Sequence, residues 1–366
     1  IMYHPISDAN DDEYVELYNR SGAAVDLSDW RLQGGIGYRF PDNTLLPAGD
    51  YLVVAENVTN LVAKYPQLDA ANTVGSYGGS LKNSGERIAL SMPEDLVTTN
   101  QHGVASTNIF YITVDEVTYL DGGRWGSWSD GGGGSLELID PDADNRLAAN
   151  WADSDESART AWTTIDVTDE MINGNPNLPE GEPTRFEFFL HGEGEALVDD
   201  LEFRHNGGGN LVANGDFGSG TSGWNVGGVL RNSYVENGAG EDGSDALHLV
   251  ATARGDTGPN KVWSHLSSTP GTYGNGTIRA NVRWLKGSPY ILFRTKGNWV
   301  EASVALNVPP DCGTPGLPNS RRVINAGPAV TEVTHTPILP AASEPVVVSA
   351  RPVDPDGVGS MTLGYR

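Results

Sequence analysis

The pattern of apolar and polar residues predicts short strands along the whole chain. Over residues 12–18, polar positions at 14, 16 and 18 alternate with Val15 and Leu17, and a period of two is that of a half-buried strand. Similar runs occur at residues 30–32, 51–55, 87–91, 115–119 and 135–139, with turn residues between them. This spacing is typical of a β-sandwich.

The second half of the chain shows the same alternation at residues 278–284, 290–294 and 299–306. In the first of these, Trp284 lies with the apolar residues, so we expect it in a core. The polar positions of the three strands could form one outward face, with Trp299 as an aromatic platform. That face would carry Arg279, Asn281, Arg283, Tyr290, Arg294, Trp299 and Glu301.

Composition narrows the class of protein. The chain has 366 residues with 48 acids against 23 bases, a formal net charge of −25. Such a surface repels a phosphate backbone, so nucleic acid is not expected as a partner.

The single cysteine, Cys312, cannot form an intrachain disulfide. No apolar stretch is long enough to span a bilayer, and because the chain begins within a strand pattern we expect a piece of a longer protein.

Five ordered motifs resemble the bacterial lamin-tail domain, an immunoglobulin-like sandwich of secreted proteins. They are Glu-Tyr-Val-Glu-Leu-Tyr-Asn at residues 13–19 and the segments at residues 25–30, 46–54, 81–88 and 130–140. The family's closing phrase, Gly-Thr-Pro-Gly-x-Pro-Asn, appears only at residues 313–319. About 160 residues separate it from Trp151, far more than a loop of a compact domain holds. We therefore expect an inserted second domain.

The insert resembles the galactose-binding-like jelly rolls of carbohydrate-binding modules. Strand signals at residues 186–190 and 196–203 are followed by Asn-Leu-Val-Ala-Asn-Gly-Asp-Phe at residues 210–217. In that class the second phrase usually opens the domain, so either the order is permuted or two partial copies abut. The resemblance implies a structural calcium ion, with Asp200 and Asp216 at the matching positions.

The expected organisation has four parts. A lamin-tail-like sandwich covers residues 1–150, with its closing phrase at residues 313–319, and a jelly-roll sandwich inserted before that phrase covers residues 151–312. A linker at residues 313–326 leads to residues 327–366, which resemble the start of a third, truncated immunoglobulin-like sandwich. The predicted fold class is thus all-β.

Local motifs for catalysis are missing from the sequence. No serine has the flanking glycines of a nucleophile elbow, no Gly-Lys-Ser/Thr run forms a P-loop, and seven scattered histidines lack a zinc-binding pair. Alternating acids at residues 8–12, 140–144 and 354–356 suit either solvated turns or calcium. A pair of carboxylates that cleaves glycosides is defined in space, so the sequence leaves it open. We expect no enzyme.

Three functions remain. The first is an extracellular, secreted or cell-surface, binding and adhesion array that recognises a polysaccharide or other glycan through the jelly roll, where aromatic rings and hydrogen-bonding groups would hold the sugar. The second is a structural spacer that contacts other surface proteins. The third is the accessory region of an enzyme whose catalytic domain lies outside these residues.

Overall fold

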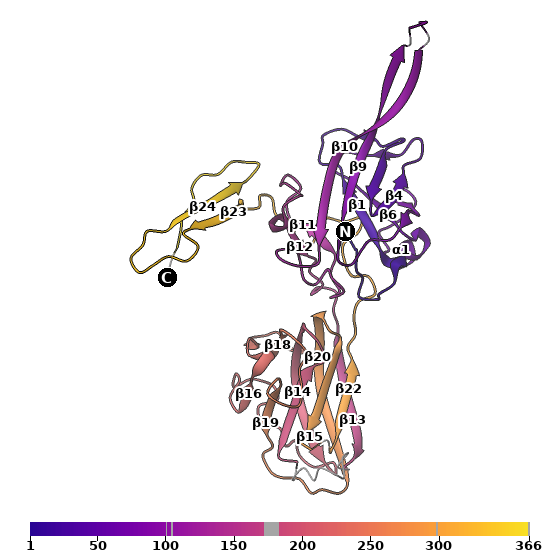
Figure 1. Cartoon of the computed structure of the whole chain (residues 1–366). Coiled ribbons are helices and arrows are strands. Elements are labelled where there is room, and N and C mark those ends of the chain that lie inside the picture. The colour runs from indigo at the N-terminus through magenta and orange to yellow at the C-terminus, as the bar shows by residue number, and fades with distance from the viewer. Residues whose placement is uncertain (100, 104, 172–182, 298, 365–366) are drawn as a thin grey trace. The chain divides into compact units, whose positions relative to one another are not determined.

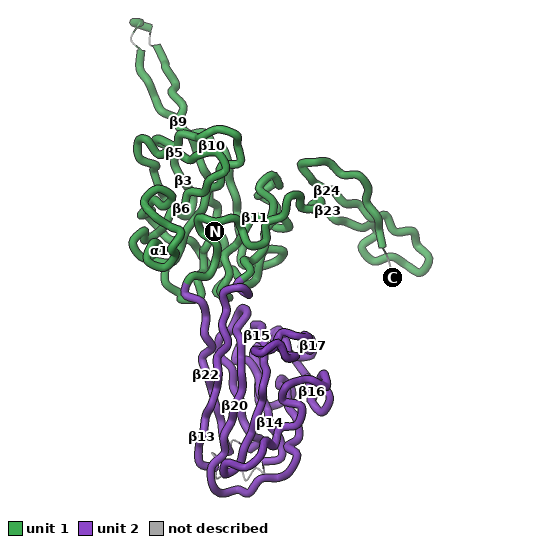
Figure 2. Tube along the Cα trace, turned by 180° about the vertical axis from the view of Figure 1, so that it is seen from behind, with its two compact units in different colours: residues 1–155, 311–366 green, residues 156–310 purple. Residues whose placement is uncertain are grey.

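The computed structural model describes residues 1–99, 101–103, 105–171, 183–297 and 299–364. They form two compact units (Figure 2): unit 1 comprises residues 1–155 and 311–366, and unit 2 comprises residues 156–310. Strands make up nearly all of the regular structure (Figure 1), which confirms the all-β class. No helix in the described ranges is long and apolar enough to cross a membrane.

One short α-helix interrupts the strands of unit 1, where the sequence pattern predicts none. Helix α1 (Val58–Lys64) begins at Asn57, whose side chain accepts a hydrogen bond from the backbone of Asn60. This is the usual way to satisfy a free amide at a helix start. The remaining helical turns are 3-10 turns: η1 (Asn10–Asp12), η2 (Ala148–Asn150) and η3 (Gly228–Leu230).

Unit 1 is built from a three-stranded and a five-stranded sheet. The first has the order β1 (Tyr14–Tyr18), β6 (Tyr51–Ala55), β7 (Thr73–Gly75). The second has the order β10 (Ala105–Leu120), β9 (Gly85–Thr99), β3 (Arg31–Gly34), β4 (Ile36–Arg39), β8 (Gly78–Gly79). Two small pairs lie beside these sheets: β2 (Val25–Asp26) with β5 (Leu45–Leu46), and β11 (Leu136–Leu138) with β12 (Trp151–Asp153).

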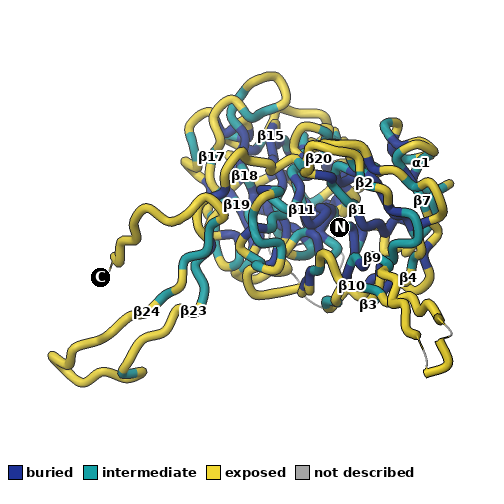
Figure 3. Tube along the Cα trace, turned by 90° about the horizontal axis from the view of Figure 1, so that it is seen from above, coloured by how far each residue is buried: buried dark blue, intermediate teal, exposed yellow. Residues whose placement is uncertain are grey.

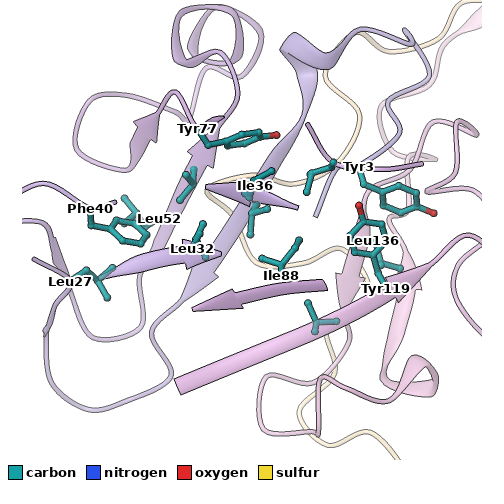
Figure 4. Close-up of a cluster of buried hydrophobic side chains, with 14 of the residues drawn as sticks. Tyr3, Leu27, Leu32, Ile36, Phe40, Leu52, Tyr77, Ile88, Tyr119 and Leu136 are labelled. Carbon is teal, nitrogen blue, oxygen red and sulfur yellow. The ribbon is translucent and has the colours of Figure 1, made fainter. Parts of the chain in front are cut away.

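The core of unit 1 is a cluster of buried aliphatic and aromatic side chains from both sheets (Figure 4). Leu32 and Ile88 reach it from the five-stranded sheet, and Leu52 reaches it from the three-stranded one. Val15 of β1 also enters this core at 4% exposure, as the alternation predicts. The opposite face of β1, which carries Tyr14, Glu16 and Tyr18, must be covered by something else.

Residues 312–322 return from unit 2 and cover that face. The hydroxyl of Tyr65 donates to the carbonyl of Cys312, the amide of Gly316 donates to Glu16, and the guanidinium of Arg322 lies 5.1 Å from the ring centre of Tyr18. A side chain at Gly313, whose φ is +89°, would collide with the Tyr14 hydroxyl. The returning segment is therefore fitted closely to β1.

Glu137 of β11 is the main anchor of this segment, although it is only 3% exposed. Its Oε2 accepts hydrogen bonds from the amide and the hydroxyl of Ser320, at 2.7 and 2.8 Å, and its Oε1 accepts one from the hydroxyl of Thr314. The amide of Asp155 donates to Ser320 Oγ at 2.7 Å, so the outgoing and returning chains lie side by side. Residues 313–322, which include the closing phrase at residues 313–319, are thus part of unit 1.

Unit 2 consists of two five-stranded antiparallel sheets. One, called sheet G, has the order β13 (Trp162–Glu170), β20 (Asn275–Gly287), β15 (Gly194–His205), β18 (Ala246–Ala251), β17 (Tyr234–Glu236). The other, called sheet H, has the order β16 (Trp224–Val226), β19 (Val262–His265), β14 (Arg185–Leu190), β21 (Tyr290–Thr295), β22 (Glu301–Ala305). Each of the two sheets contains strands from before and from after Asn210. Unit 2 is therefore one domain and not two partial copies.

Aromatic side chains fill the space between the two sheets. Trp284 is fully buried, as its place in the alternation predicts, and Phe188 stacks on Phe293 with ring centres 5.4 Å apart. Trp224 packs against Phe217, and its indole N–H donates to the carbonyl of Asn214 at 2.9 Å. This dense core gives the outer faces of the sheets a rigid support.

The last described part of the chain is a two-stranded hairpin of β23 (Ala329–Thr336) and β24 (Val347–Val353). It is exposed along most of its length (Figure 3), including Val333, Val347 and Leu339. That it begins a further sandwich stays a prediction.

We predict that Glu137→Gln destabilises unit 1 by about 2–3 kcal/mol, because a neutral amide replaces a buried carboxylate that accepts several hydrogen bonds. Urea unfolding measures this loss of stability, and hydrogen exchange at residues 312–322 shows whether the loss affects that segment. The control is Glu116→Gln, which removes an exposed ion pair with Arg87 and should cost less than about 1 kcal/mol. Equal midpoints for the two variants would show that Glu137 is no anchor.

Candidate functional site

The polar residues predicted to share one face lie on two different sheets. Arg279, Asn281 and Arg283 belong to β20 of sheet G, whereas Tyr290 and Arg294 belong to β21 of sheet H. Because the two sheets enclose a common core, their outer faces point in opposite directions. The prediction of one polar face is therefore wrong. Alternation distinguishes inward from outward positions, but it cannot assign consecutive strands to a sheet.

On sheet H the predicted residues have unequal surroundings. Tyr290 is 53% exposed at the start of β21, and Glu301 is exposed on β22. Trp299 lies in the turn before β22, not in the strand as expected, and is half-buried. Only Tyr290 therefore offers a largely open aromatic ring.

Arg294 is a structural residue rather than an open ligand group, because it belongs to a buried ion cluster on the outer face of sheet H. Its Nε donates to Oε2 of Glu187 at 3.2 Å, and Lys261 Nζ lies 2.8 Å from Oε1 of the same carboxylate. The side chains of Glu187 and Arg294 are 1% and 7% exposed. Gly255, in the loop that leads to Lys261, packs against Phe189 and helps to cover this face.

Trp263 is an aromatic residue of the same face that the sequence reasoning missed. It lies opposite Glu187 in the β14–β19 pairing, and the guanidinium of Arg185 lies 4.2 Å from its ring centre. Alternation did not point to it, because Ser264 is polar in the sequence although it is buried in the fold.

Sheet G carries a pocket of about 540 Å³ on its outer face. It brings together four residues that the sequence analysis singled out for two separate reasons: Arg279 and Asn281 as sugar contacts, and Asp200 and Asp216 as metal ligands. The remaining lining is Thr164, Ile165, Leu201, Glu202, Asn210, Val212, Asn214, Gly215 and Ala280.

A β-bulge in β15 creates the pocket. Asp199 pairs with Asn281 and Glu202 pairs with Arg279, so β15 has one more residue than β20 between these pairs. Asp200 in the bulge adopts a φ of +51°, the left-handed region that Asp tolerates better than most residues. The bulge turns Asp200 outward, where its Oδ2 accepts a hydrogen bond from Asn281 Nδ2 at 3.1 Å.

Asn210 holds the opposite wall of the pocket. Its Oδ1 accepts hydrogen bonds from the amides of Phe203 and Val212, at 3.0 and 2.9 Å, and its Nδ2 donates to the carbonyl of Leu201 at 3.1 Å. The Asn-Leu-Val-Ala-Asn phrase therefore has a structural role, which is to fix the strand-like segment beside β15. The pocket is preformed by backbone contacts.

Charges in the pocket are partly compensated. Arg279 donates to Asp166 at 2.9 Å and lies 4.0 Å from Glu202. Hydrogen bonds from Arg204 hold the pKa of Glu202 below its usual range. Behind the pocket, burial raises the pKa of Asp199, which accepts a hydrogen bond from the hydroxyl of Ser244. The carboxyl oxygens of Asp200 and Asp216 are the more open acceptors.

Arg283, the third polar residue of β20, does not line the pocket. Its Nε donates to the hydroxyl of Thr160 at 2.8 Å, and its guanidinium also reaches the carbonyl of Ser157. It therefore anchors the segment that leads into β13.

The structure gives no support to the predicted metal sites by itself. Within the described ranges no three His, Cys, Asp or Glu side chains are placed to hold a metal ion. In the acidic runs, Asp12 pairs with Lys64, Asp144 pairs with Arg146, and Asp140 accepts the amide of Ala326 at 2.9 Å. These carboxylates therefore make ion pairs and hydrogen bonds within the chain.

A larger cavity of about 990 Å³ lies in unit 1 and includes Glu16 and Glu137 in its lining. Burial raises the pKa of Glu16 to about 7. Both carboxylates nevertheless accept hydrogen bonds from the returning segment. They stabilise the fold, and we place the candidate site in the pocket of sheet G.

His248 of β18 is clamped between two carboxylates on the outer face of sheet G. Its Nε2 lies 2.9 Å from Glu195 and its Nδ1 lies 2.9 Å from Glu236, while Tyr234 stacks on the ring at 4.8 Å. Burial lowers the pKa of His248, but the hydrogen bonds to Glu195 and Glu236 outweigh burial and raise it.

The comparisons with known proteins concern unit 1. Residues 1–110 match the lamin tail domain. The matched range contains four of the five motifs and confirms the resemblance for this part of the chain. The lamin tail domain is an immunoglobulin-like, non-enzymatic interaction module. No curated protein and no solved structure matches the chain, and unit 2 lies outside the matched residues.

We predict that Glu187→Gln destabilises unit 2 by about 3–5 kcal/mol, because Arg294 and Lys261 lose the buried carboxylate between them. Thermal unfolding measures the loss. Glu301→Gln, which changes only the exposed partner of Arg294, should cost less than about 1 kcal/mol. A small loss for both variants would mean that the cluster is hydrated and not buried.

We also predict that unit 2 loses stability as the pH rises above about 6.5, the ordinary pKa of histidine. A raised folded-state pKa means that the protonated His248 contributes fully below that pH, and its contribution disappears as the pH passes the folded-state value. Urea midpoints between pH 6 and 9 should fall for the native chain and stay flatter for His248→Gln. His265→Gln, on the other sheet, should show the same change of midpoint with pH as the native chain. If His248→Gln also showed that change, His248 would not be its cause.

Proposed function

We propose that this chain is a non-catalytic, extracellular binding array in which unit 2 is a galactose-binding-like jelly roll that binds carbohydrate. The supporting observation is the pocket of sheet G, where an amide, carboxylates and a guanidinium line one concavity. The bulge at Asp200 and the hydrogen bonds between the Asn210 side chain and the backbone fix these groups before a ligand binds. Preorganised polar groups bind with a smaller loss of entropy.

The chemistry of the pocket suits sugar hydroxyls. Each hydroxyl both donates and accepts hydrogen bonds, so it can donate to Asp200 or Asp216 and accept from Asn281 or Arg279. A volume of about 540 Å³ lies within the range of small-molecule sites. None of the described residues that line the pocket is aromatic, so the pocket would bind the polar edge of a sugar and not its apolar face.

Calcium is proposed as an auxiliary ligand in the same pocket. Asp200 and Asp216 supply hard carboxylate oxygens, which calcium prefers. Two carboxylates are too few to complete its coordination, so sugar hydroxyls or water would supply the rest. Sugar affinity would then depend on the ion.

Contacts with other surface proteins form a second proposed function, carried by the lamin-tail match of residues 1–110. In this arrangement unit 1 is a spacer and protein contact, and the sugar site lies in unit 2. The same arrangement would also suit the third function, an accessory region of an enzyme whose catalytic domain lies outside these residues.

The test is a glycan array followed by calorimetry on the 366-residue chain, with and without calcium. We predict saturable binding that Asn281→Ala and Asp200→Asn each weaken at least tenfold, because one removes a donor and the other a charged acceptor. The matched control is Tyr290→Ala on the opposite face, which should bind like the native chain.

Two results would contradict the proposal. Absence of binding to every glycan, in both calcium conditions, would leave a structural array. Loss of binding in Tyr290→Ala or Trp299→Ala, with Asn281→Ala unaffected, would move the site to sheet H.

A further inference from the structure

The outer ends of β9 and β10 form a two-stranded arm that extends beyond the sheet of unit 1 (Figures 1 and 3). Strand β3 pairs with β9 only from Ile88 to Ser91, whereas the pairing of β9 with β10 continues to Thr99 and Ala105. We call residues 92–99 and 105–113 the arm. In the described part of the chain, no third strand pairs with it.

Large apolar side chains are exposed on both faces of the arm. Phe110 and Ile112 lie on one face at 52% and 47% exposure, and Ile109 and Val97 lie on the other at 59% and 61%. A two-stranded ribbon has no core in which to bury them. Apolar surface gathered in this way on an otherwise acidic chain marks a contact surface.

The two edges of the arm differ in how they are protected. The β9 edge carries Pro93, Glu94 and Asp95, which are the residue types that block unwanted strand pairing. The β10 edge runs through residues 105–114, Ala-Ser-Thr-Asn-Ile-Phe-Tyr-Ile-Thr-Val, with no charge and no proline. Charged residues return only at Asp115 and Glu116. The β10 edge is thus open to a further strand over ten residues.

We propose that the β10 edge of the arm pairs with β10 of a second copy of this chain, antiparallel across a two-fold axis. The net charge of −25 makes copies repel each other over most of their surface. The strand that meets this edge must itself be uncharged and rich in β-branched and aromatic residues, and β10 satisfies that requirement. The arm's acids, Glu94 and Asp95, lie on the far strand.

Strand geometry restricts the register of this pairing. Opposite residues of an antiparallel pair share a face, so the two-fold axis must pass through a residue of β10. An axis at Phe110 places Phe110 against its own copy, and Ile109 against the copy of Tyr111. Such aromatic and β-branched cross-strand pairs stabilise a sheet.

The protected β9 edge predicts a closed dimer. Once the two β10 edges have paired, each outer edge of the four-stranded ribbon is a β9 strand with Pro93, Glu94 and Asp95. An isologous contact of this kind uses up its own surface and stops at two copies.

Sedimentation velocity on the full chain over a wide concentration range tests the proposal. We expect a reversible monomer–dimer equilibrium, which Phe110→Lys weakens at least tenfold because like charges would face each other across the axis. The control is Val97→Lys, which places the same charge on β9, one strand away from the axis. Monomers at every concentration, larger polymers, or equal weakening by both variants would overturn the proposal.

Cross-linking gives a second test that does not depend on charge. In a chain whose buried Cys312 is replaced by alanine, single cysteines at residues 108–112 should form intermolecular disulfides most readily near residue 110, as two-fold symmetry requires. Val97→Cys should not cross-link. An even yield along β10 and β9 would show collision without pairing and overturn the proposal.

Discussion

The attachment of residues 312–322 to the buried carboxylates Glu137 and Glu16 is the contact on which the organisation of this chain depends. Glu137 takes hydrogen bonds from a hydroxyl and an amide of Ser320 and from Thr314, and Glu16 takes one from Gly316. Because this segment follows unit 2 in sequence and completes unit 1 in space, unit 1 is built from two stretches of the chain that meet next to β12. The bond from Asp155 to Ser320 fixes that meeting point. An inserted domain is tolerated where its two ends lie close together.

Each unit has one local irregularity in its strands, and the two irregularities have different consequences. In unit 2, one extra residue in β15 turns Asp200 outward and opens a polar pocket beside Asn281, as bulges commonly re-aim side chains. In unit 1, the extension of β9 and β10 beyond β3 leaves an open edge with no charge between residues 105 and 114. The pocket suits a small polar ligand and the edge suits a strand. The two proposed contacts therefore use different residues of the chain.

The sequence predicted β1, β3, β6 and β11 and parts of β9 and β10, the burial of Trp284 and the all-β class, because a period of two records which side chains face a core. It did not predict which sheet each strand joins, and so Arg279 and Tyr290 were placed on one face although they lie on opposite ones. The bulge at Asp200, the cover over Arg294 and the contact of Trp263 with Arg185 depend on pairs distant in sequence. Residues 313–319 were recognised as a closing phrase, but their carboxylate anchors at positions 16 and 137 required the fold.

The most direct test of the closed, discontinuous unit 1 is a comparison of two shortened chains by urea unfolding with hydrogen exchange at β1 and β11. In the first, a short Gly-Ser link replaces residues 156–310; in the second, the chain ends at residue 310. We predict that the first keeps the cooperative unfolding of unit 1, and that the second loses protection at β1 and β11 because Glu16 and Glu137 are buried without their donors. Equal stability of the two chains would contradict the role assigned to residues 312–322.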